Sequence, residues 1–208
     1  MNLPFNFFDL LLLLVLAAGL LRGRKHGFSL ELLSLLKWLT LLLVCAAVYG
    51  PVGAMLAESG QFDLLSAYLL AYLFTALVVF VVFALIQSRV GPKLIGSDVF
   101  GRSEYYLGMG SGIVRFGCMT LVALALLNAR AFSSAELAAT DKFQQENYGS
   151  HVFPGLHTLQ VAVFNDSLTG SFIKQDLGFL LIASTEPSEK EPRQKESRPA
   201  SAATTAKR

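Results

Sequence analysis

The chain has 208 residues, of which 53% are hydrophobic and 15% are charged. An ordinary water-soluble domain carries about 25% charged residues, so this composition argues against that class of protein. The net charge of +2 is too small to indicate a nucleic-acid partner. Length and composition therefore point to a membrane protein.

Four long apolar runs lie within residues 5–127, at 5–21, 28–49, 62–86 and 105–127. About 20 apolar residues in a helix span a hydrocarbon core, so the last three runs are long enough and the first is at the short limit. Leu-rich runs of this length favour helices over barrel strands, which alternate polar and apolar residues. The predicted fold class is all-α, an integral membrane bundle of four transmembrane helices.

Basic residues occupy every second gap between these runs. The first gap carries Arg22, Arg24 and Lys25, and the third gap carries Arg89, Lys93 and Arg102. The second gap, residues 50–61, has none. Because Lys and Arg in short loops accumulate on the cytoplasmic side, this pattern predicts that both termini are extracytoplasmic. The positive charge follows the first run instead of preceding it, which argues against a cleaved signal peptide.

A more polar segment follows, at residues 128–183. Ser133 and Glu136 have the spacing of a capping box, which predicts a polar helix over 134–148. Apolar residues then recur at helical spacing over 156–163 and, after an expected break at Gly170, over 172–181. These stretches are too short to span and predict extracytoplasmic amphipathic helices that lie on the membrane surface or cap the bundle. The composition of residues 184–208 predicts a disordered tail.

The ionisable residues of interest inside the predicted spans are Asp9, Glu31, Lys37 and Arg115. A charge near the bilayer centre costs on the order of 3 kcal/mol unless it is paired, hydrated or able to snorkel. One interpretation is that Lys37 and Arg115 snorkel to the cytoplasmic headgroups. Another is that Arg115 pairs with Glu31 or Glu104 and fixes how the helices dock. A third is an ion or proton path.

Glycines recur every fourth residue in two places. Gly19, Gly23 and Gly27 form one set, and Gly108 and Gly112 form the other. Residues spaced by four share a helix face, where a missing side chain lets another backbone approach closely. A flexible reverse turn is an equally good interpretation of Gly23 and Gly27.

Three polar residues of the third run, Tyr68, Tyr72 and Thr75, also share a helix face. Their hydroxyl groups either hydrogen-bond Lys37 or Arg115, or belong to the core and the interface. The core and interface interpretation is preferred.

The chain shows no pattern of catalytic or metal-binding residues. His26, His151 and His157 are not spaced as zinc ligands, and Cys45 and Cys118 lie inside apolar runs without a metal or redox spacing. No Ser, His and Asp set is arranged for nucleophilic chemistry. We therefore predict no cofactor, no metal and no enzymatic activity.

Two blocks of residues resemble the colicin V production protein family. The first block consists of Asp9, Gly23, Gly27, Phe28, Glu31 and Trp38, and the second consists of Glu104, Leu107, Gly108, Gly112 and Arg115. The chain departs from the family at His26, Leu30, Glu104 and Phe116, where basic residues, Asp and Gly are more usual. The resemblance covers about residues 5–127 and implies a small bacterial inner-membrane protein with four spans.

The resemblance further implies a role in toxin production or secretion, or more broadly in envelope homeostasis, without a known reaction. The first hypothesis is a non-enzymatic accessory protein that acts through the lipid bilayer and through membrane protein partners or further copies of itself. The glycine faces, the basic loops and the outer segment are its expected contact surfaces. The alternative is an oligomeric channel or transport subunit in which Arg115 and Lys37 line an anion path.

Overall fold

The computed structural model describes residues 6–94, 103–132 and 155–185. This part of the chain is helical apart from turns, short connections and one isolated β-bridge between Arg130 and Thr185. The helices are α1 (Phe7–Glu58), α2 (Leu64–Leu94), α3 (Ser103–Asn128), α5 (Leu156–Phe164) and α6 (Leu168–Asp176), followed by the 3-10 helix η1 (Gly178–Leu180). The polar helix predicted at 134–148 and the tail after residue 185 lie outside the described residues.

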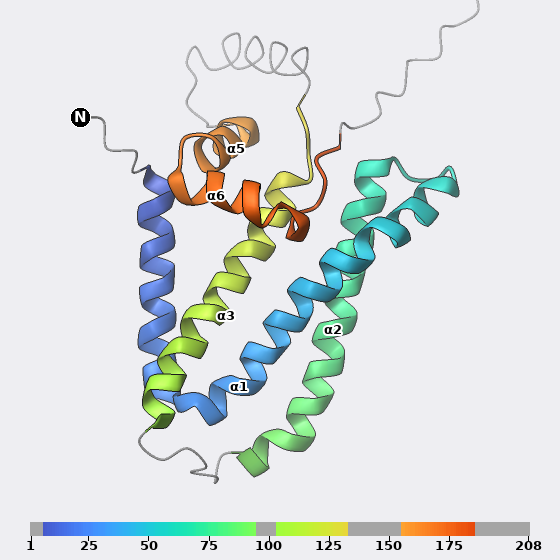
Figure 1. Cartoon of the computed structure of the whole chain (residues 1–208). Helices are drawn as coiled ribbons and strands as arrows, with labels where there is room; N and C mark the ends of the chain where they lie inside the picture. Colours follow the sequence, from blue (N-terminus) through green and yellow to red (C-terminus); the bar gives the residue numbers. More distant parts are fainter. Residues whose placement is uncertain (1–5, 95–102, 133–154, 186–208) are drawn as a thin grey trace, which may run out of the picture.

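Helix α1 contains the first two apolar runs and reverses direction between them. Gly27 has φ 72° and ψ 168°, outside the helical region, so residues 7–26 and 28–58 form two helical arms. A positive φ of this kind costs glycine little, because it has no Cβ. The turn interpretation of Gly27 is therefore right. Figure 1 shows the first arm running down to this turn and the second arm rising from it.

Among the described residues, three helices are long and apolar enough to cross a membrane: Glu31–Glu58, Leu64–Val90 and Ser103–Asn128. They contain most of the second, third and fourth apolar runs. The first arm, residues 7–26, is helical as well, and its crossing of the membrane remains a prediction. The described residues thus form an all-helical protein with three candidate spans.

The second arm is longer than the sequence predicts. The apolar run ends at Tyr49, but α1 continues through Pro51 to Glu58, so the predicted loop at 50–61 is mostly helix. A proline inside a helix removes one backbone hydrogen bond, and neighbouring packing can compensate for that loss. Here Gly53 lies directly against the ring of Tyr68 on α2, where a Cβ would collide.

Helix α1 connects the bundle, since it contacts both α2 and α3. In Figure 1 the first arm lies beside α3, and α2 runs along the second arm. The main core forms around Leu41, Cys45 and Tyr72, which are buried. The Tyr72 hydroxyl has no hydrogen-bond partner within the described part of the chain, so this residue belongs to the core, as preferred from the sequence.

Helices α5 and α6 lie across the end of the bundle opposite the Gly27 turn (Figure 1). The Tyr49 hydroxyl donates to the carbonyl of Leu181 at 3.3 Å, and the Asn128 amide donates to the carbonyl of Ile182 at 2.9 Å. Ile182 is fully buried. The segment after α6 is therefore anchored to α1 and to α3, and it caps this end of the bundle.

The predicted break at Gly170 is wrong. Gly170 lies inside α6 and is buried against the backbone carbonyl of Val163 on α5, where a Cβ would collide. The helix starts at Leu168, two residues before Gly170, because the hydroxyl of the N-cap residue Ser167 accepts a hydrogen bond from the Gly170 amide at 2.8 Å. Because Gly170 has no side chain, α5 and α6 can pack closely at this point.

Candidate functional site

The two glycine sets face each other across the contact between the first arm of α1 and α3. A Cβ on Gly19 would lie 2.7 Å from the carbonyl oxygen of Gly112, and a Cβ on Gly108 would lie 2.6 Å from that of Gly23. Gly23 and Gly112 are both buried. Because these distances are far below van der Waals contact, only glycine permits the observed approach of the two antiparallel backbones.

This arrangement corrects the expectation that the glycine faces bind a partner. Each set is covered by the other within one chain, so neither is available on the molecular surface. Close backbone approach increases dispersion contact, which is the main attraction between helices surrounded by lipid. The glycine faces therefore build the bundle and leave partner contacts to other surfaces.

Glu104, in the first turn of α3, lies next to the Gly27 turn of α1. Its Oε1 accepts a hydrogen bond from the backbone N–H of Ser29 at 3.2 Å. Ser29 opens the second arm, and the first N–H groups of a helix have no partner within it. The positive end of the helix dipole also favours a carboxylate at this place. Glu104 thus caps the second arm from the neighbouring helix.

Glu31 and Arg115 form an ion pair between the second arm and α3. The Arg115 Nη1 atom lies 2.5 Å from the Glu31 Oε2 atom, and their side chains are 15% and 4% exposed. Arg22 approaches the same carboxylate at 3.9 Å and is more than half exposed. The structure shows one of the sequence interpretations of Arg115, the pairing with Glu31.

The seven candidate residues at this end thus come together from three helical segments. They are Gly23, Gly27, Glu31, Glu104, Gly108, Gly112 and Arg115. We call this group the turn-end cluster. It combines a glycine contact with two carboxylates that lie near the start of one helix. Its chemistry is structural, because charges are paired and backbone donors are capped.

Trp38 and Lys37 do not belong to the turn-end cluster. The Lys37 Nζ atom lies 4.8 Å from the centre of the Phe80 ring on α2, and Trp38 meets the same ring edge-on at 5.5 Å. A lysine over an aromatic face is attracted by the ring quadrupole. These contacts join the second arm to α2.

Asp9 lies at the opposite end of the molecule, beneath α6. Its Oδ1 accepts hydrogen bonds from the Ser167 hydroxyl at 3.0 Å and the Thr169 amide at 3.1 Å, and Oδ2 accepts from the Asn6 amide at 3.1 Å. The Asn6 side chain in turn donates to the carbonyl of Ala162 at 2.7 Å. Asp9 therefore anchors the short helices to the first arm.

Sequence reasoning did not find the partners of Asp9. The spacing of Asn6 and Asp9 is that of a capping box, which the structure contains at the start of α1. That local signal could have identified Asn6. Ser167 and Thr169 are about 160 positions away in sequence, and nothing local connects them to Asp9.

The described residues contain no group of three or more His, Cys, Asp or Glu side chains that could hold a metal ion. Cys45 and Cys118 are free and buried in this part of the chain. The geometry thus shows a packed and ion-paired bundle.

A protein-family model described as Colicin V production protein matches residues 8–150, more than half of the chain. The matched range contains the turn-end cluster and Asp9 but ends before α5 and α6. No curated protein and no solved structure matched the chain.

Proposed function

Because the chain belongs to the colicin V production protein family, we propose that it is a multi-pass accessory protein of the bacterial inner membrane that supports toxin production or secretion and envelope homeostasis. The family match confirms the resemblance found in the sequence. Family membership and the apolar helices together make this chain a membrane protein. The family is not known as enzymatic. The role in secretion, the inner membrane as its place and the partners are parts of the proposal.

The turn-end cluster is the observation that carries this proposal. Glu31 and Arg115 neutralise each other, and the glycine faces leave no space between the first arm and α3. A bundle fastened in this way is suited to present fixed surfaces to other proteins. Glu31, Glu104 and Arg115 serve internal docking, which suits an accessory protein.

The outer face of α2 is a surface suited to a partner within the membrane. Ala67 and Ala71 on the inner face of α2 are buried, while large apolar side chains on the opposite side are exposed. Those exposed residues are Leu70, Leu73, Phe74, Leu77, Val81 and Leu85. Lipid alone can cover such a face, and so can a membrane helix of another protein or of a second copy.

The proposal is tested by a deletion strain combined with site-specific crosslinking. Loss of the gene should reduce the amount of secreted peptide and induce an envelope stress response. A photo-crosslinking amino acid at Phe74 or at exposed Lys25 should form adducts with another membrane protein or a second copy. The matched control is Ala71, which lies on the same helix but faces α1 and should give none.

Unchanged peptide secretion and stress response in the deletion strain, with no adduct from Phe74 or Lys25, would remove the proposal. The complemented strain serves as the reference in both assays. The crosslinking pattern also separates the two partner classes, because a second copy gives an adduct of twice the chain mass.

The alternative function, an oligomeric channel or transport subunit, has weaker support. Arg115 was expected to line an anion path, but its guanidinium is held by Glu31 and only 15% of the side chain is exposed. Anion flux in proteoliposomes that disappears in Arg115→Ala would favour a channel. Absence of flux across several ions would exclude it.

A further inference from the structure

Lys37 is a cation of the second arm that has no counter-charge in the described part of the chain. The ion pairs there are those of Glu31 with Arg115 and with Arg22, and neither includes Lys37. The nearby Arg115 guanidinium has the same sign as the Lys37 ammonium group and repels it. Lys37 is therefore half-buried beside a like charge, and the described residues supply no acid to balance it.

The aromatic contacts of Lys37 place its charge at hydrocarbon depth. Its Nζ atom lies 4.8 Å from the centre of the Phe80 ring and 5.9 Å from that of the Trp38 ring. Phe80 lies near the middle of the candidate span Leu64–Val90, about 15 Å from its nearer end at 1.5 Å per residue. Ring faces attract a cation, but they offset only part of the cost of a charge at this depth.

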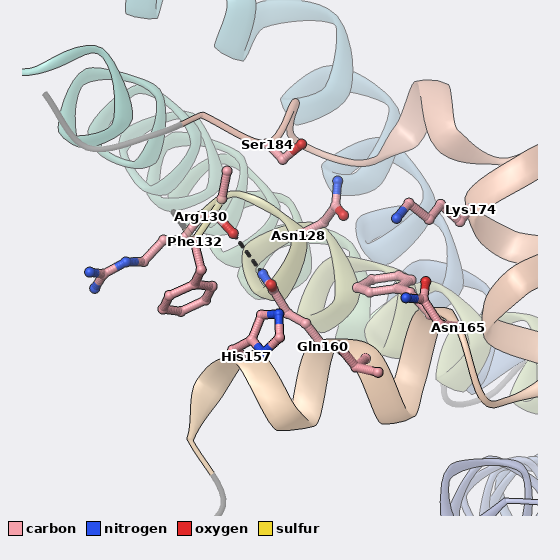
Figure 2. Close-up of a pocket in the computed structure, with 11 residues that line it drawn as sticks. Asn128, Arg130, Phe132, His157, Gln160, Asn165, Lys174 and Ser184 are labelled. Atoms are coloured by element: carbon pink, nitrogen blue, oxygen red, sulfur yellow. Dashed lines mark hydrogen bonds between the residues drawn. The ribbon is translucent and has the colours of Figure 1, made fainter. Parts of the chain in front are cut away.

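Lys174 shows the contrasting situation at the capped end of the bundle. It lines a pocket of about 210 Å³ beside the C-terminal end of α3, together with Asn128, Gln160 and Asn165 (Figure 2). Lys174 is exposed, so water can hydrate its ammonium group. Lys37 lies between two candidate spans and needs another source of compensation, and a cation at such a place indicates a functional contact.

Three sources of negative charge can be compared for Lys37. Phospholipid phosphates lie at the bilayer surface and not near the middle of a span. The candidate spans of a second copy offer Glu31, which Arg115 holds, and Glu58 and Glu104, which lie at helix ends. A membrane helix of another protein can carry Asp or Glu at the required depth, and a paired charge in a membrane costs far less than an isolated one.

We propose that Lys37 binds an Asp or Glu side chain on a transmembrane helix of another protein, and that this helix packs along the flank of α2 beside Phe80. Leu73 and Leu77 lie seven and three positions before Phe80 and are exposed on this flank, where they can cover the apolar part of the partner helix. The ring contacts orient the ammonium group without neutralising it. The inference rests on the proposed function, because it gives the chemistry of the partner that an accessory protein requires.

The test is photo-crosslinking in cells that produce the full chain. A photo-crosslinking amino acid replaces Leu77, and mass spectrometry identifies the adduct. The variant Lys37→Met removes the charge, and Lys37→Arg keeps it. The matched control is Lys25→Met, which makes the same change of net charge at an exposed position in the Gly27 turn region.

We expect the adduct to contain a membrane protein with Asp or Glu inside a span. Lys37→Met should lower the adduct yield about tenfold or more, because truncating one partner of a buried charge pair speeds dissociation. Lys37→Arg and Lys25→Met should keep the yield. Lys37→Glu combined with Lys in place of the partner's acid should restore the adduct. Lys37→Met should leave the unfolding temperature in detergent close to that of the wild type, because the chain by itself has no ion pair at Lys37 among the described residues.

No adduct from Leu77 in the wild type, an adduct of twice the chain mass, a partner without an acid in its spans, or an unchanged yield in Lys37→Met would overturn the proposal. A fall of the unfolding temperature in parallel with the adduct yield would also overturn it, since Lys37 would then act in folding. These outcomes leave the proposed function standing when the deletion strain shows the secretion and stress phenotype. Absence of that phenotype and of every adduct removes both.

Discussion

At the scale of single residues, the main feature is the ion pair between Glu31 and Arg115. Each charge is stabilised by its partner and not by water. Glu31 and Arg115 are both largely buried and 2.5 Å apart. Removing one partner of a buried pair is costly because the other charge stays behind without compensation. Glu31 also lies close to the start of the second arm, where the helix dipole favours a negative charge.

We expect Glu31→Gln to lower the free energy of unfolding by about 3–5 kcal/mol, because Arg115 loses its counter-charge. Thermal unfolding in detergent measures the effect. Glu58→Gln is the control, since Glu58 lies on the same helix but is exposed. The double variant Glu31→Gln, Arg115→Met should regain part of the stability. Equal stability of Glu31→Gln and Glu58→Gln would contradict the role of the pair.

At the scale of helices, the glycine contact determines how the first arm and α3 dock. Gly112 faces the carbonyl of Gly19. A Cβ added to Gly110, two positions earlier on α3, would meet no atom within 4 Å. The same helix therefore contains one glycine that is required by its neighbour and one that is not. This difference makes a matched pair of variants.

Gly112→Leu should destabilise the contact by at least about 1–3 kcal/mol, because the added side chain forces the two backbones apart. Gly110→Leu should have little effect. The measurement is disulfide formation between cysteines introduced on the first arm and on α3, together with the unfolding temperature. Similar behaviour of the two leucine variants would show that the close approach is not needed.

The second contact between elements joins Asp9 to α6. Asp9 is 6% exposed and accepts hydrogen bonds from Ser167 and Thr169. Asp9→Ala removes these bonds, and hydrogen bonds to a charged group contribute about 1.5–3 kcal/mol each. We expect faster amide hydrogen exchange and faster tryptic cleavage after Lys174 in this variant. Asp176→Ala, at the exposed end of α6, is the control and should match the wild type.

At the scale of the whole molecule, the structure places the basic turn region and the short helices at opposite ends (Figure 1). Arg22, Arg24 and Lys25 lie near the Gly27 turn, while α5 and α6 cover the other end. If the first arm crosses the membrane, the distribution of basic residues predicts that the capped end is extracytoplasmic.

An alkaline phosphatase fusion after Ser184 should therefore be active, because this enzyme needs the oxidising side of the membrane. The same reporter inserted at Lys25 should be inactive. A cytoplasmic fluorescent reporter at both sites gives the complementary pattern. An inactive phosphatase after Ser184 beside a bright cytoplasmic reporter would reverse the orientation.

The sequence by itself determined the membrane class, the three long apolar helices among the described residues and the family, because each depends on local properties. Run length and hydrophobicity set the transfer free energy of a helix, and the two motif blocks lie within residues 9–38 and 104–115. The spacing of the glycines also indicated close packing, since residues four apart share one helix face.

Only the tertiary structure decided which groups meet. Arg115 had two possible acids, and the choice of Glu31 over Glu104 depends on where the Gly27 turn places the second arm. Glu104 is used elsewhere, as a cap for Ser29. The continuation of α1 past Pro51 brings Gly53 against Tyr68 on α2. These outcomes are contacts between distant segments, and their free energies are not encoded in any single stretch of sequence.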